Sequence, residues 1–220
     1  MADSFAVDKT NKVRQLDQYA SYDRDTVHGI LDAGLVAHVA FVQDDGPVVV
    51  PMIYGRDGDT VFLHGARKAR VIRLLEKTDR ASINVTLLDG IVYARSVFNS
   101  SMNYRSVTLF GKPELIEGND AKLAAMRHIS EHVMPGRWDE VRASHEREVK
   151  MTGVIRLPIE AASAKITGGH PSDEDEDYDI PIWAGVLPVT TRVGERIDAD
   201  RLIPGVEASD IVRRRENRNL

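Results

Sequence analysis

The chain has 220 residues, 42% of them hydrophobic, and a formal net charge of −5 at pH 7. A chain of this length buries roughly 70% or more of its unfolded surface, as one large domain or two small ones. The absence of cysteine excludes disulfides, thiolate metal sites and cysteine nucleophiles, and the acidic balance gives no electrostatic footprint for nucleic acid.

The start of the chain has no apolar core of the kind that a secretory signal needs, and no run approaches 18 apolar residues. We therefore expect a cytoplasmic protein with neither a membrane nor a nucleic-acid partner. Residues 1–22 are polar and aperiodic, which predicts an N-terminal arm that is mobile or ordered only against a partner subunit.

The first predicted helix follows Asp23, where Val27, Ile30 and Leu31 have helical spacing. Residues 35–42 then predict a strand that leads through a turn into the central part of the chain.

The central stretch predicts a β-hairpin followed by a short helix. Two β-rich runs, Pro47–Tyr54 and Thr60–His64, are joined by the turn Gly55–Asp59. The second run passes directly into residues 69–75, whose apolar positions suit one helix face. Because Pro51 cannot donate to a strand ladder, we expect one edge of its strand to be unpaired there.

The next segment predicts further strands. Residues 80–87 and 91–98 form two of them, joined by a tight turn at Asp89-Gly90, and residues 104–110 bend into 114–117.

A clear helix follows Gly118 and ends at Pro135-Gly136, and residues 137–146 predict a second short helix. Residues 149–157 and 159–166 predict the last two strands. About seven strands and three or four helices without βα alternation indicate a mainly β fold of the α+β class, a barrel with appended helices.

The C-terminal part changes in character. Six acids within residues 173–179 should repel one another and form an exposed loop, without the spacing of an EF-hand. Residues 182–188 are strongly apolar around Trp183, and the last eight residues are basic. We expect a domain over residues 23–188 and a C-terminal extension over 189–220.

Several common catalytic patterns are missing. The sequence has no G-x-S-x-G, Walker A or G-x-G-x-x-G motif. His128 and His132 are spaced i, i+4, but Glu131 precedes the second histidine instead of following the first, so the zincin pattern does not fit. We assign no metal ligand and no catalytic side chain, and interpret this histidine pair as a solvated helix face.

The end of the hairpin carries a concentration of basic residues. Gly65, Arg67, Lys68 and Arg70 lie where the second strand enters the helix. Cations are mildly unfavourable at a helix N-terminus, so three of them there call for an anion. We therefore predict a phosphate-binding site at this junction.

The order of apolar hairpin, Phe62-Leu-His-Gly-Ala-Arg-Lys-Ala69 and short helix resembles the core of the pyridoxamine 5′-phosphate oxidase-like FMN-binding split β-barrels. The similarity extends from about residue 24 to 188 and includes the nitroimidazole-resistance-like, nitroreductase-type subgroup. It implies a homodimer that binds FMN at the subunit interface.

The resemblance also implies roles for individual residues. The FMN phosphate would lie on Arg67 and Lys68, at a junction that includes Gly65 and Ala66. The backbone along the flavin ring would come from Val50, Pro51, Met52 and Ile53.

Four further side chains have two interpretations each. His64 lies beside the flavin or is a structural strand-end histidine. Asn84 and Ser106 hydrogen-bond the polar edge of the flavin or point to solvent. Trp183 reaches the flavin or the interface of the other subunit, or belongs to the core.

The hairpin lacks the arginine, and the C-terminal region the Arg-x-His pair, that hold substrate in true pyridoxamine phosphate oxidases, so that substrate is not expected. The expected reaction is hydride transfer from NADH or NADPH to the flavin, followed by reduction of a small electrophile such as a nitroaromatic or a quinone. The alternatives are a non-enzymatic flavin carrier or sensor, or the same barrel binding deazaflavin F420 or haem, with His64 as the first candidate axial ligand.

Overall fold

The computed structural model describes residues 3–44 and 46–220. The chain forms two compact units, one from the residues up to Leu87 with Asn103–Gly169, and one from Leu88–Met102 with His170–Leu220. No helix of the described residues is long and apolar enough to cross a membrane.

Ten strands of the described residues form one antiparallel system in the order β1-β9-β6-β5-β2-β3-β4-β8-β7, with β10 paired to β5. The strands are β1 Ala20–Ser21, β2 Val36–Gln43, β3 Gly46–Asp57, β4 Thr60–Ala66, β5 Ala81–Tyr93, β6 Ser101–Gly111, β7 Glu114–Leu115, β8 Thr152–Pro158, β9 Ala161–Thr167 and β10 Gly185–Pro188. The helices are α1 Arg24–Ala33, α2 Arg70–Leu75, α3 Asn119–Val133, α4 Glu146–Met151 and α5 Asp210–Arg215, with 3₁₀ turns η1 Asp17–Tyr19, η2 Arg137–Asp139 and η3 Asp175–Asp177.

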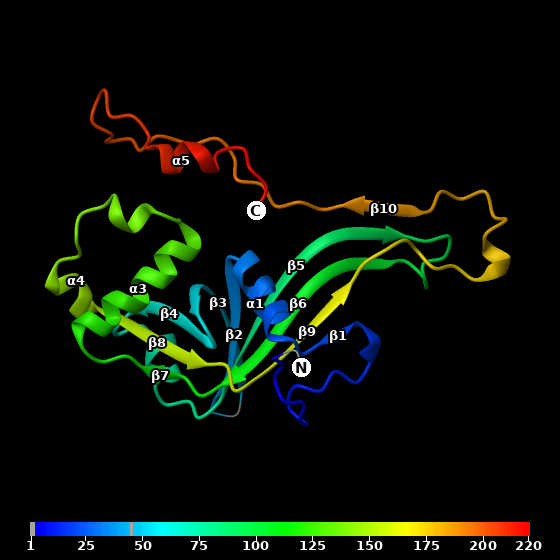
Figure 1. Cartoon of the computed structure of the whole chain (residues 1–220), viewed down its shortest axis with the longest axis horizontal. Helices are drawn as coiled ribbons and strands as arrows, with labels where there is room; N and C mark the ends of the chain where they lie inside the picture. Colours follow the sequence, from blue (N-terminus) through cyan, green and yellow to red (C-terminus); the bar gives the residue numbers. More distant parts are fainter. Residues whose placement is uncertain (1–2, 45) are drawn as a thin grey trace. The chain divides into compact units, whose positions relative to one another are not determined.

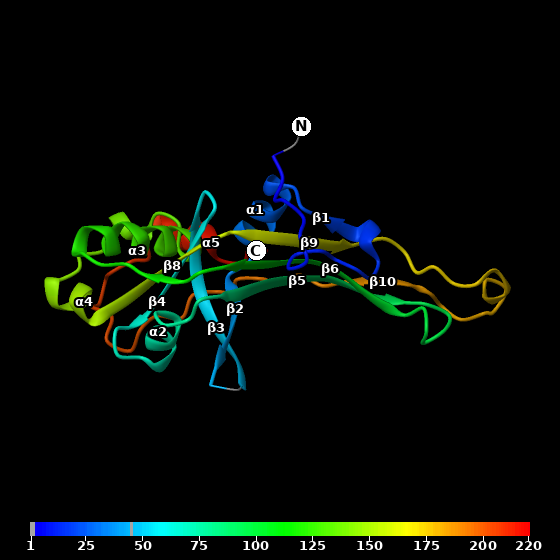
Figure 2. The ribbon, with the colours of Figure 1, turned by 90° about the horizontal axis from the view of Figure 1, so that it is seen from below.

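The long strand β3 belongs to two sheets (Figure 2). Its first part, Gly46–Ile53, pairs with β2, and its last part, Tyr54–Asp57, pairs with β4. In the described residues, the other edge of Gly46–Ile53 has no strand partner, and Pro51 lies on that part of β3. The predicted hairpin and the unpaired edge at Pro51 are both confirmed.

The hydrophobic core lies in the first unit. Tyr54 is fully buried, and its hydroxyl donates to the carbonyls of Leu31 and Gly34, so α1 and the start of β2 are tied to β3. The largest other fully buried side chains are Leu31, Leu63, Ile72, Leu75, Ile83, Leu109, Ile155 and Leu157.

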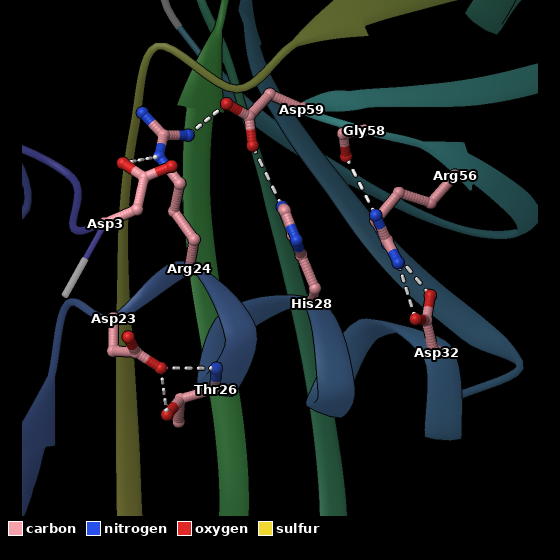
Figure 3. Close-up of polar contacts among 9 residues, drawn as sticks. All are labelled: Asp3, Asp23, Arg24, Thr26, His28, Asp32, Arg56, Gly58 and Asp59. Carbon is pink, nitrogen blue, oxygen red and sulfur yellow. Dashed lines mark hydrogen bonds and ion pairs between the residues drawn. The ribbon is translucent and has the colours of Figure 1, made fainter.

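Helix α1 is fastened to the turn between β3 and β4 (Figure 3). The carboxylate of Asp59 accepts one hydrogen bond from Arg24 and lies 2.9 Å from the His28 ring nitrogen. Arg56 on β3 makes a two-point ion pair with Asp32 at the end of α1, at 2.8 and 2.5 Å. These contacts fix the turn from which β4 starts.

Helix α3 lies over β4 and β8 and packs against β3 (Figure 1). The approach is close at Gly55, where an added Cβ would lie 2.5 Å from the backbone carbonyl carbon of His128. Only a residue without a side chain lets α3 reach the sheet at this depth.

Several sequence-based boundaries are wrong. The predicted tight turn at Asp89-Gly90 does not exist, because Gly90 pairs with Pro188 of β10 and β5 continues to Tyr93. The strand predicted from residue 149 begins only at Thr152, because Val149 lies in α4. The polar N-terminal segment folds back, and Phe5 is buried in the core beneath the Arg24 guanidinium.

In the second unit, the acidic run is not wholly exposed. The Asp173 side chain is fully buried and accepts hydrogen bonds from the backbone amide and guanidinium of Arg95, at 2.8 and 3.0 Å. The same guanidinium lies 5.0 Å from the Tyr178 ring centroid. Charge repulsion predicted a fully solvated loop, but one carboxylate with a paired cation is stable inside.

Candidate functional site

The β4–α2 junction is tightly built. Gly65 and Ala66 pair with Gly153 and Thr152 of β8, and an added Cβ on Gly153 would lie 3.2 Å from the Arg67 Cα. The amide of Arg67 donates to the Met151 carbonyl at 2.8 Å. The junction is therefore a fixed corner of the first unit.

The charges at this corner differ from the expectation. Arg67 makes a two-point ion pair with Glu76, at 3.1 and 3.2 Å, and Arg70 hydrogen-bonds Gln43. Lys68 is exposed and makes no described hydrogen bond or ion pair. Arg67 and Arg70 are therefore already bound to groups of the protein itself. Of the three cations, Lys68 is the one without a described partner.

The backbone that we predicted to lie along a flavin ring, Val50–Ile53, is in the part of β3 whose second edge is unpaired. Along Val50–Ile53 the exposure alternates, with Pro51 and Ile53 exposed and Val50 and Met52 half-buried. This edge of β3 has no strand partner in the described residues, which is what the sequence predicted from Pro51.

His64 has the most unusual environment of the predicted residues. Its Nδ1 atom is buried and has no hydrogen-bond partner in the described structure, and burial lowers the pKa of the ring. The side chain lines a cavity of about 180 Å³. The rest of the lining comes from β3, α3 and the segment after α3, namely Ile53, Met126, Ile129, Ser130, Val133, Met134 and Trp138.

This arrangement can bind a metal that needs one protein nitrogen. A buried polar atom without a partner is costly, so such an atom calls for an explanation. A neutral imidazole presents a lone pair, and the side chains around it in the cavity are mostly aliphatic or thioether groups.

The two histidines of α3, His128 and His132, have partners. His132 lies 2.6 Å from the Gly34 carbonyl and against the Tyr54 ring, and His128 stacks on Phe62 at 5.4 Å. The interpretation of a solvated helix face is therefore wrong, because this face of α3 packs on the strands.

A family model described as pyridoxamine 5′-phosphate oxidase matches residues 23–166. The chain belongs to this family. A search of curated proteins gave no match.

Solved structures of the pyridoxamine 5′-phosphate oxidase type extend the similarity. The flavocytochrome Anf3 of Azotobacter vinelandii is 36% identical, over 96% of this chain and 98% of that chain, with a TM-score of 0.89. An FAD- and haem-binding protein of Mycobacterium smegmatis is 38% identical, over 90% and 98%, with a TM-score of 0.86.

A 5-nitroimidazole antibiotic resistance protein of Bacteroides thetaiotaomicron shares the fold at 23% identity, over 67% of this chain and 86% of that chain, with a TM-score of 0.56. The predicted mainly β split barrel with appended helices is confirmed.

Within this oxidase-type fold, the polar strand residues are already engaged. The Asn84 amide donates to the Val107 carbonyl and the Thr108 hydroxyl, both at 3.1 Å, and Ser106 lies 3.5 Å from the Lys165 carbonyl. Trp183 belongs to the second unit, where it is 63% exposed and packs on Tyr93.

Sequence reasoning missed the apolar wall of the His64 cavity. Met126, Ile129 and Val133 follow helical spacing, which is the ordinary signal of any core-facing helix. Neither that spacing nor Trp138 in its short turn indicates a cavity, because a cavity depends on how α3 meets β3 and β4.

Proposed function

We propose that the protein is a two-cofactor redox protein, with a flavin at the β3 edge and the β4–α2 junction and a haem held by His64. Two observations carry the proposal: Nδ1 of His64 is buried without a partner, and the His64 side chain lines an apolar cavity. Support comes from two near-full-length relatives, one called a flavocytochrome and the other FAD- and haem-binding.

His64 is the residue that we assign to the haem. Because burial lowers its pKa, the ring stays neutral at pH 7 and keeps a lone pair for iron. A bound haem supplies one-electron transfer at its iron. Ile129 and Val133 of α3 give the same cavity an apolar wall.

For the flavin, we assign Lys68 to the phosphate and the free backbone edge of Val50–Ile53 to the ring. Arg67 can bind the phosphate only if its guanidinium is shared between the phosphate and Glu76 or is released from Glu76. We propose FMN as the flavin and NADH or NADPH as its electron donor, with a quinone or a nitroaromatic as the small acceptor.

We propose that the working form is a homodimer. On β2 and β3 an apolar strip is exposed, with Val36 opposite Ile53 and Val42 opposite Pro47. In the same strip Val42 is 67% and Val49 60% exposed. A contiguous apolar face of this kind favours an interface, at which Trp183 of a second copy can contact the flavin.

The test of the haem site is the absorption spectrum of protein expressed with haem supplied. We expect a Soret band in the wild type, loss of that band in His64→Ala, and no change in the control His170→Ala, whose side chain is exposed. Flavin absorbance should persist in all three. An undiminished Soret band in His64→Ala contradicts the assignment of His64, and purified protein that binds neither cofactor contradicts the proposal as a whole.

The flavin site is tested by Lys68→Ala. Loss of one charge-assisted contact, worth about 1.5–3 kcal/mol, should weaken flavin binding by roughly tenfold or more. Lys77→Ala is the matched control and should bind as the wild type does. Chromatography of the released cofactor distinguishes FMN from FAD.

A further inference from the structure

The His64 cavity is small for a haem. Its volume of about 180 Å³ lies below the roughly 300–1,000 Å³ of sites that enclose a drug-sized ligand. Either only the edge of such a ligand enters, or the site continues beyond one of its walls.

One wall of the cavity separates it from a second hollow. Trp138, in the turn η2, lines both the His64 cavity and a hollow of about 420 Å³ between α3 and the segment before α4. With both volumes available, the space is of the size that a large planar ligand needs. Trp138 is therefore a lining residue that the two hollows share.

The second hollow differs in chemistry from the first. It is lined by the apolar residues Leu123, Ala124 and Val141, and also by Arg127 and Arg142. An apolar surface that ends in two guanidinium groups suits a flat apolar ring with carboxylates at one edge, which is the chemistry of a haem and its propionates.

Both arginines hold partners that they can exchange. Arg127 pairs with Asp139 at 2.9 Å and Arg142 with Glu148 at 2.5 Å, and all four side chains are at least 47% exposed. Exposed ion pairs of this kind stabilise a protein little, so an incoming carboxylate can replace Asp139 or Glu148 at small cost. Asp139 belongs to the same short turn, η2, as Trp138.

We propose that Trp138 is a movable partition and that the haem site continues past it to Arg127 and Arg142, which bind the propionates. This inference rests on the proposed haem function. The iron end of the ligand meets His64, and the carboxylate end lies near the entrance from solvent. Arg127 and Arg142 are binding residues, and Trp138 controls entry.

The experiment is a titration of full-length, haem-free protein with haem and with haem dimethyl ester, followed at the Soret band. Arg127→Ala/Arg142→Ala should weaken haem binding roughly tenfold or more but leave binding of the ester unchanged, because the ester has no free carboxylates. Arg137→Ala is the matched control, since Arg137 lies in the same turn, pairs with Glu140 and lines neither hollow.

The partition is tested by stopped-flow mixing. Trp138→Ala should take up haem faster than the wild type, and Trp138→Phe should lie between them. Retained flavin absorbance and an unchanged unfolding midpoint show that each variant is folded. If the double alanine variant does not fold, the more conservative variant Arg127→Gln/Arg142→Gln replaces it, because glutamine removes the charge but keeps a polar side chain.

The outcomes separate the two proposals. If His64→Ala abolishes haem binding but the arginine and Trp138 variants bind haem as the wild type does, this inference is overturned and the proposed function stands. If the wild type binds no haem at any concentration, both fall. If the ester loses affinity as much as haem does in the arginine variant, the propionate contacts are overturned.

Discussion

At the scale of single residues, His64 has a ring nitrogen that is costly to bury but that could bind a metal. A ring nitrogen without a partner destabilises the folded chain, and the cost is largest when the ring is charged. A bound metal would remove that cost. The residue is therefore better suited to the cofactor-bound protein than to the empty one.

This environment predicts a pH dependence of the cofactor-free protein. The pKa of His64 is lowered in the folded state, so the unfolded chain binds the proton more readily below its own pKa of about 6.5. The contribution to stability is complete above that value and is lost as the pH falls through the folded-state pKa. Urea unfolding at several pH values should show this decline in the wild type and a weaker one in His64→Leu. Equal slopes in the two proteins contradict the prediction.

A second residue-scale prediction concerns Tyr54. Its hydroxyl is buried between two acceptors, and burial raises its pKa far above the usual value. Tyr54→Phe leaves the Leu31 and Gly34 carbonyls without this donor, which should cost about 1–3 kcal/mol of unfolding free energy. Denaturant titration with an unchanged slope measures the loss. A variant as stable as the wild type would show that water replaces the hydroxyl.

At the scale of elements, the seating of α3 depends on Gly55. In Gly55→Ala the new methyl group would overlap the helix backbone at His128, so helix and strand must separate. We expect a loss of about 1–3 kcal/mol and, because α3 forms one wall of the His64 cavity, weaker haem binding. Both are measured on one preparation by unfolding and by Soret titration.

Gly29→Ala is the matched control for that substitution. Gly29 lies in α1 with nothing within 4 Å of the added Cβ, so alanine should stabilise the helix by about 0.5–1 kcal/mol. Similar effects of the two substitutions would mean that α3 adjusts without loss.

The second unit depends on one buried ion pair. Asp173→Ala removes the carboxylate partner of Arg95 and leaves that cation partly buried, which typically costs about 3–5 kcal/mol. We expect the segment around residues 170–180 to open locally and to be cut faster in limited proteolysis. Asp175→Ala, at an exposed position of the same run, should be cut at the wild-type rate.

At the scale of the whole molecule, the apolar strip on β2 and β3 predicts self-association. Light scattering should give twice the chain mass for the wild type. Val49→Lys places a charge in the strip, so its mass should fall to that of one chain. Gln18→Lys, outside the strip, should leave the dimer intact. A monomeric wild type contradicts the dimer.

The parts of the fold that the sequence predicted are those with a local cause. The helix after Asp23 has its cap and its spacing, and the edge at Pro51 follows from a missing donor. The continuation of β5 through Gly90 could not be predicted, because its reason is a partner strand about a hundred residues further along.

The candidate site divides in the same way. The cluster of Arg67, Lys68 and Arg70 was visible in the sequence, but the pairing of Arg67 with Glu76 needs the fold of α2. His64 was identified as a candidate, whereas its unpartnered nitrogen and the position of Trp138 arise only when α3 packs on β3.

The two exposed prolines of β3 have a consequence for how the protein survives without its ligands. A strand with one free edge is a template on which another chain can add a strand and begin a fibril. Pro47 and Pro51 interrupt that edge, since neither can donate a hydrogen bond to an added strand. The two prolines thus make this free edge a poor template for an added strand.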